Sequence, residues 1–93
     1  MFNFFNKKEK NNIKETTAKD LNKQAQEAVK ARSEGEVSGI MRGVENSAKQ
    51  GYTFIEYGLR ERVDYVYVKE DLENSGFKVN ITKDRIIIDW SEA

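Results

Sequence analysis

The sequence predicts an α+β domain: a small antiparallel sheet with helices packed on one face. Three observations support this class. Apolar residues recur at spacings of three and four up to about residue 50, and then change to alternation. Glycines stand at positions 51 and 76, where helices are expected to end, and the last third resembles a hairpin. We expect the order α-α-β-α-β-β, with residues 1–15 as a flexible N-terminal arm and 16–93 as a single domain.

The first expected helix covers Thr16–Arg32. Thr16 or Thr17 can cap its N-terminus, and Asp20 lies near the positive end of the helix dipole. Its apolar stripe is narrow and made of small residues, namely Ala18, Leu21, Ala25 and Ala28. Because such a stripe buries little area, this helix is expected to pack on a second copy or on the core domain.

A second helix is expected from Ser33 to Gly51. Ser33 and Glu36 match the capping-box pattern, and Gly51 suits a left-handed C-cap. The apolar face comprises Val37, Ile40, Met41, Val44 and Ala48. A single helix running through Ser33 stays open, because the earlier stripe continues in Gly35, Gly39 and Gly43. Each glycine costs about 1 kcal/mol against alanine, which close approach of another backbone or of a flat ligand would offset.

The remaining segments alternate as strands, with one exception. Tyr52–Leu59, Phe77–Thr82 and Arg85–Trp90 are expected strands, and Lys83-Asp84 joins the last two in a hairpin. Glu61–Ser75 is expected to be a helix that stops at Gly76, although Val63–Val68 also fits a strand. Trp90 is expected to close the hairpin on the helices.

Composition excludes several classes of function. The chain has 16 basic and 16 acidic residues, and this balance argues against general nucleic-acid binding. It has no cysteine or histidine, so thiolate, triad and Cys/His zinc chemistry are absent. We therefore expect no catalytic residues, metal or cofactor. No apolar run approaches the roughly 20 residues that span a bilayer. A cytoplasmic protein, without membrane association and forming a homo-oligomer, is expected.

One group of side chains suits a phosphate-bearing ligand. Guanidinium groups bind phosphate bidentately and tyrosine rings stack on nucleobases. The candidate ligand-binding residues are Arg42, Tyr52, Tyr57, Arg60 and Arg62. The alternative interpretation is solvated charges beside core tyrosines.

Two further features have alternative interpretations. Asp84 and Asp89 could form a metal or acid–base pair, or could be edge charges that oppose aggregation. Phe2, Phe4 and Phe5 precede Lys7, Lys8 and Lys10. They suit a frayed terminus, an aromatic peg that docks on a partner subunit, or a surface membrane anchor.

The stretch Ile40–Trp90 resembles small phage-encoded accessory proteins. The resemblance lies in a helix ending in Ala48-x-x-Gly51, an alternating strand, a segment with Leu72 leading to Gly76-Phe77, and a strand ending in Trp90. Some proteins of this class are oligomers that sequester nucleotide immune signals. The resemblance implies a non-enzymatic counter-defence protein that binds a cyclic dinucleotide or a cyclic ADP-ribose. The alternative is an inhibitor or adaptor that binds a host protein through the Phe2–Phe5 arm or an exposed sheet edge.

Overall fold

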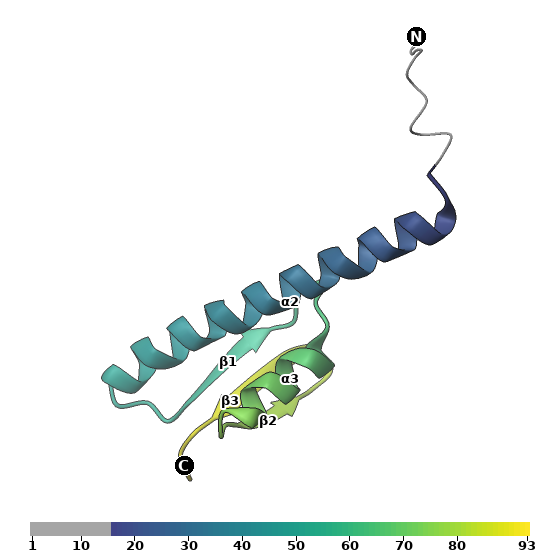
Figure 1. Cartoon of the computed structure of the whole chain (residues 1–93). Helices are drawn as coiled ribbons and strands as arrows, with labels where there is room; N and C mark the ends of the chain where they lie inside the picture. Colours follow the sequence, from purple (N-terminus) through teal and green to yellow (C-terminus); the bar gives the residue numbers. More distant parts are fainter. Residues whose placement is uncertain (1–15) are drawn as a thin grey trace.

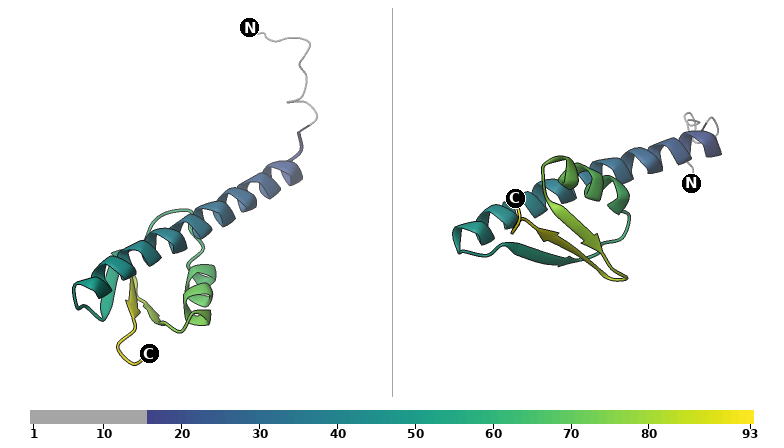
Figure 2. Two further views of the ribbon diagram at one scale, coloured as in Figure 1. Left: turned by 60° about the vertical axis from the view of Figure 1, so that its left-hand side comes forward. Right: turned by 90° about the horizontal axis from the view of Figure 1, so that it is seen from below.

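The α+β class is confirmed by the computed structural model, which describes residues 16–93. The predictions for residues 1–15 lie outside the described residues. The elements are α2 (Ala18–Lys49), β1 (Phe54–Gly58), α3 (Tyr65–Asn74), β2 (Lys78–Ile81) and β3 (Arg85–Asp89). The strands form one antiparallel sheet in the order β1-β3-β2. Figures 1 and 2 show α2 as a long rod that extends well beyond the small body built by the other elements.

The two helices expected before residue 52 are one helix of 32 residues, about 48 Å long. The expected capping box at Ser33 and Glu36 is wrong, because both residues lie within α2. Ser33 does not interrupt the helix, since its hydroxyl donates to the carbonyl of Val29 at 2.7 Å, four residues earlier. The N-terminal capping box is formed by Thr17 and Asp20, each side chain accepting from the other's backbone N–H.

Both helices end in the same way. Gly51 and Gly76 have φ angles of 94° and 96°, the left-handed conformation that glycine tolerates. The N–H of Tyr52 donates to the carbonyl of Ser47, and that of Phe77 donates to Leu72. Together with the bonds from the glycine N–H groups to Ala48 and Glu73, these are Schellman motifs. The predicted C-terminal glycines of both helices are confirmed.

The helix expected over Glu61–Ser75 begins later, at Tyr65. The Asp64 carboxylate caps it by accepting from the N–H groups of Val66 and Tyr67. Arg62 has a φ of 59° and cannot belong to a right-handed helix. The segment from Arg60 to Asp64 is therefore a connection, and the strand alternative over Val63–Val68 is wrong because α3 begins at Tyr65.

The strand registers place one apolar row on the face that both helices cover. Ile88 pairs with Ile55 and Val79, and Ile86 pairs with Tyr57 and Ile81. Tyr52 and Phe54, expected within the alternating strand, are exposed instead. Phe77 and Trp90 make an edge-to-face contact at 6.2 Å beside this row, so Trp90 closes the core as predicted. The buried apolar residues are Ile40, Val44, Val68, Leu72, Val79, Ile86 and Ile88.

The helix glycines differ in what surrounds them. A methyl group on Gly43 would overlap the Tyr57 hydroxyl and lie 3.0 Å from its Cζ, so β1 approaches α2 closely here. Nothing lies within 4 Å of a methyl group on Gly35. The expected close approach therefore exists at Gly43, and its source is a tyrosine ring rather than a second backbone.

Gly43→Ala is expected to lower the free energy of unfolding by about 1–3 kcal/mol, because Tyr57 must move to admit the methyl group. Gly35→Ala, in open space on the same helix, is expected to raise it by about 0.5–1 kcal/mol. Urea unfolding measures both. In a Tyr57→Phe background, Gly43→Ala should cost less. Equal effects at the two glycines would contradict the close contact.

Candidate functional site

A chain of hydrogen bonds fixes the connection between β1 and α3 against α2. The Ser33 hydroxyl is fully buried and accepts from the backbone N–H of Asp64 at 2.7 Å. Three residues further along α2, Glu36 accepts from the hydroxyl of Tyr65 at 2.8 Å. The Tyr65 oxygen in turn accepts from the backbone N–H of Arg60 at 2.9 Å. The pattern Ser33-x-x-Glu36 thus holds a loop about 30 residues away rather than a helix end.

The electrostatics of this network favour a neutral Tyr65. Burial raises the pKa of the Tyr65 phenol, and its bond to the Glu36 carboxylate raises the pKa further, while the Arg60 N–H opposes both. The guanidinium of Arg60 lies 3.6 Å from Glu36, with its side chain 73% exposed and that of Glu36 only 13% exposed. Arg60 therefore neutralises the charge of a largely buried carboxylate and still presents most of its own surface to solvent.

Three of the five predicted ligand-binding residues gather beside this network. Tyr57 and Arg60 line a hollow of about 180 Å³ with Glu36, Gly39, Ile40 and Gly58, which we call the Arg60 pocket. The Arg42 guanidinium lies 4.0 Å from where a methyl group on Gly39 would be, so it borders the same pocket. Gly39 and Gly58 have no side chains, so neither residue narrows the pocket. The pocket lining therefore combines the Arg60 guanidinium with a tyrosine ring, and the Arg42 guanidinium lies near its Gly39 wall.

The other two predicted residues do not line the Arg60 pocket. Tyr52 lies just beyond the C-terminus of α2 and is 58% exposed. Arg62 stands in the left-handed turn before α3, and its guanidinium lies 4.0 Å from the Glu61 carboxylate. Both side chains face solvent at separate places, as solvated surface residues do.

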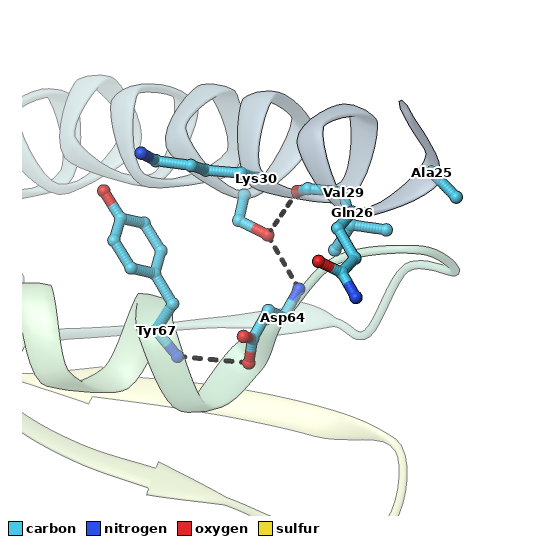
Figure 3. A pocket seen from close by; sticks show the side chains of 7 residues that line it. Ala25, Gln26, Val29, Lys30, Asp64 and Tyr67 are labelled. Carbon is cyan, nitrogen blue, oxygen red and sulfur yellow. Dashed lines mark hydrogen bonds between the residues drawn. The ribbon is translucent and has the colours of Figure 1, made fainter. Parts of the chain in front are cut away.

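A larger hollow lies between α2 and the start of α3 (Figure 3). We call it the α2–α3 groove; its volume is about 490 Å³. Figure 3 shows the Tyr67 ring pointing from α3 toward α2, with the Ser33–Asp64 bond beside it. The lining is mainly methyl groups, an aromatic ring and aliphatic stems, from Ala25, Gln26, Val29, Lys30, Ser33, Asp64 and Tyr67.

Carboxylates surround the ring of this groove. The pKa of the Tyr67 phenol is raised, first by its loss of solvation and then by the negative charges of Asp71 and Glu34. The Asp64 carboxylate lines the groove itself, whereas Lys30 is the cation in its lining. The groove is therefore apolar inside with a mainly acidic rim.

Apolar side chains continue outside the groove. On α2, every residue from Ala18 to Ala28 is exposed, so about three turns of the helix bury little surface in the described residues, although Ala25 and Gln26 line the groove. Leu21 on these turns is 55% exposed, and Val66 at the start of α3 is 68% exposed. The sequence reasoning identified the stripe of Leu21 and Ala25 but missed the groove. Two residues could have indicated the groove in the sequence. Val29 is a β-branched residue on the stripe, and Asp64 is the true cap of α3.

The described residues offer no converging group for metal or acid–base chemistry. Asp84 directly precedes β3 and Asp89 is its last residue, so the two are about 17 Å apart along an extended strand. Asp89 accepts from the N–H of Ser91, which lowers the pKa of its carboxyl. Within residues 16–93, no three His, Cys, Asp or Glu side chains are placed to hold a metal ion, and no helix there is long and apolar enough to cross a membrane.

Comparison with known proteins adds nothing to these assignments: no family model, curated protein or solved structure matches the chain.

Ser33→Ala is expected to lower the free energy of unfolding by about 1–3 kcal/mol, because the Asp64 N–H and the Val29 carbonyl lose their buried partner. Ser38→Ala, exposed on the same helix, should change it by less than about 0.5 kcal/mol. Chemical denaturation followed by far-UV circular dichroism compares the two variants. Equal values would mean that the Ser33 bond contributes nothing net.

Proposed function

We propose that this chain is a non-catalytic binding protein that recognises another protein chain through the α2–α3 groove and the exposed turns of α2. The observation that carries the proposal is the open apolar groove, together with the exposed apolar side chains of Leu21 and Val66 on the two helices that form it. Exposed apolar side chains that adjoin one another around a hollow mark interaction surfaces more often than scattered ones. Of the two functions that the sequence suggested, this is the inhibitor or adaptor.

The length of α2 supports the same proposal. All residues of its first three turns are exposed in the described structure, whereas helices in water owe most of their stability to tertiary packing. These turns begin at a capping box formed by Thr17 and Asp20. The sequence therefore specifies a helix where the domain does not need one. A partner that packs along them and fills the groove accounts for both the apolar residues and the cap.

The first test compares two faces of α2. Leu21→Glu and Ala25→Glu place charges beside the groove, and Ala31→Glu places the same charge on the opposite side of the helix; all three positions are exposed. In affinity capture from a lysate of the source cells, the recovery of a specific partner should fall at least tenfold with the first two variants. It should be retained with Ala31→Glu. Equal recovery with all three variants would refute the groove as the binding surface.

A second candidate is the sequestration of a nucleotide signal by a homo-oligomer, as implied by the resemblance to small phage proteins. The gathering of Arg42, Tyr57 and Arg60 around one pocket favours it. The pocket volume of about 180 Å³ is below the roughly 300–1,000 Å³ typical of small-molecule sites. A single copy therefore accommodates a phosphate or one part of a nucleotide, and a whole cyclic dinucleotide requires a second subunit.

This candidate predicts a thermal shift. A cyclic dinucleotide or cyclic ADP-ribose at 100 times its Kd should add about 2.7 kcal/mol of stability, several degrees in Tm. Scanning fluorimetry should show this shift in the unmodified chain and lose it in Arg42→Ala with Arg60→Ala. Arg62→Ala, outside the pocket, is the matched control. No shift with any compound, in a chain that captures a partner through the groove, would decide against the second candidate.

A further inference from the structure

We infer that the α2–α3 groove is the docking site for the N-terminal segment of the same chain, with the Phe2–Phe5 cluster in the groove and the lysines that follow it at the acidic rim. The inference concerns the free chain, and a second protein that binds in the groove must first displace the segment. It assigns an occupant to a surface that the described residues leave open.

The chain is long enough to reach. The groove is centred near Val29, twelve residues along α2 from the Thr17 cap, which is about 18 Å of helix. Ten residues lie between Phe5 and Thr16, and the eleven extended steps from one to the other span about 36 Å. The segment can therefore turn back at the cap and run beside α2 with length to spare. At Thr17 the backbone is extended, with φ −103° and ψ 165°, so the chain leaves the helix axis there.

The chemistry of the two surfaces is complementary. The groove is lined by Ala25, Val29 and the ring of Tyr67, and its volume of about 490 Å³ exceeds what one side chain fills. The segment offers three phenylalanines within four residues. Apolar contacts of this kind, including offset or edge-to-face packing on the tyrosine ring, are the main source of burial energy for aromatic side chains.

Charge also favours this occupant. Four of the 16 basic residues and two of the 16 acidic residues precede Thr16, which leaves 12 basic and 14 acidic residues in the described part. The groove lining holds Asp64 and Lys30, and the carboxylates of Asp71 and Glu34 lie close enough to Tyr67 to raise the pKa of its phenol, so acidic groups outnumber basic ones here. A basic segment is therefore attracted to an acidic rim, and the attraction should weaken with salt.

We expect the segment in the groove to belong to the same chain, because a tethered segment has a higher local concentration at the groove than the segment of another copy. A short tether gives a local concentration in the millimolar range, which exceeds the concentration of free chain in ordinary solution. A second copy that exchanges its segment is the competing arrangement, and the experiment below separates the two.

The test uses the absence of cysteine in the sequence, since every disulfide is then one that was introduced. Asn6→Cys keeps all three phenylalanines. It is combined in the full chain with Gln26→Cys, which lines the groove, or with Ala31→Cys, exposed on the opposite side of the same helix. Disulfides require Cα atoms about 4.4–6.8 Å apart, so the rate of closure reports proximity. Mild oxidation of micromolar protein, followed by non-reducing electrophoresis and mass spectrometry, measures that rate.

We expect the Gln26→Cys pair to close within the monomer at least ten times faster than the Ala31→Cys pair. Changing Phe2, Phe4 and Phe5 to Ser should remove this difference, and 0.5 M NaCl should reduce it. Equal rates for the two pairs would overturn the inference. Disulfide-linked dimers as the main product would also overturn it, in favour of exchange between copies. Because the measurement uses purified protein only, its failure is distinct from a failure to capture a partner.

Discussion

The arrangement of this domain depends on one buried hydroxyl. The Ser33 hydroxyl donates to a carbonyl of its own helix and accepts from the Asp64 N–H. Its donor and its acceptor therefore both have partners although the group is buried from water. Asp64 then caps α3 with its carboxylate. A single residue of α2 therefore determines where the connection from β1 passes and where α3 begins. The α2–α3 groove lies beside this contact, since Ser33 and Asp64 both line it.

Local patterns were enough to predict most elements but not the way in which they meet. Gly51 and Gly76 have short-range requirements for a left-handed backbone, and both were identified correctly. Ser33 and Glu36 satisfy the capping-box pattern equally well inside a helix, because the pattern contains nothing of Asp64 and Tyr65 about 30 residues later. The same limit applies to the ligand residues. Tyr57 and Arg60 line one pocket with Gly39 only because α2 packs against the end of β1, whereas Tyr52 and Arg62 were grouped with them by proximity in sequence alone.

Glu36 connects the two surfaces that carry the proposals. Its carboxylate pairs with Arg60 at the small pocket and accepts from Tyr65, the first residue of α3. The next turn of α2 toward the N-terminus holds Ser33 and the groove. The arginine pocket and the groove are thus separated by about one turn of the same helix, and both are built on contacts to the connection between β1 and α3. A phosphate that drew the Arg60 guanidinium away would break its ion pair with Glu36, and the Glu36 carboxylate would keep only its hydrogen bond from Tyr65.

The strand order has a consequence for the synthesis of this protein. β3 lies in the centre of the sheet, yet it is made after both of its neighbours, and β1 and β2 do not pair with each other. Two fully buried core residues, Ile86 and Ile88, belong to β3. On the ribosome, α2 can form as soon as it emerges, whereas no strand can pair until residues 85–89 have been added. Until then β1 and β2 both lack a partner. Assembly of the sheet is therefore a late event, and a nascent chain stalled before residue 85 leaves two strands without a partner.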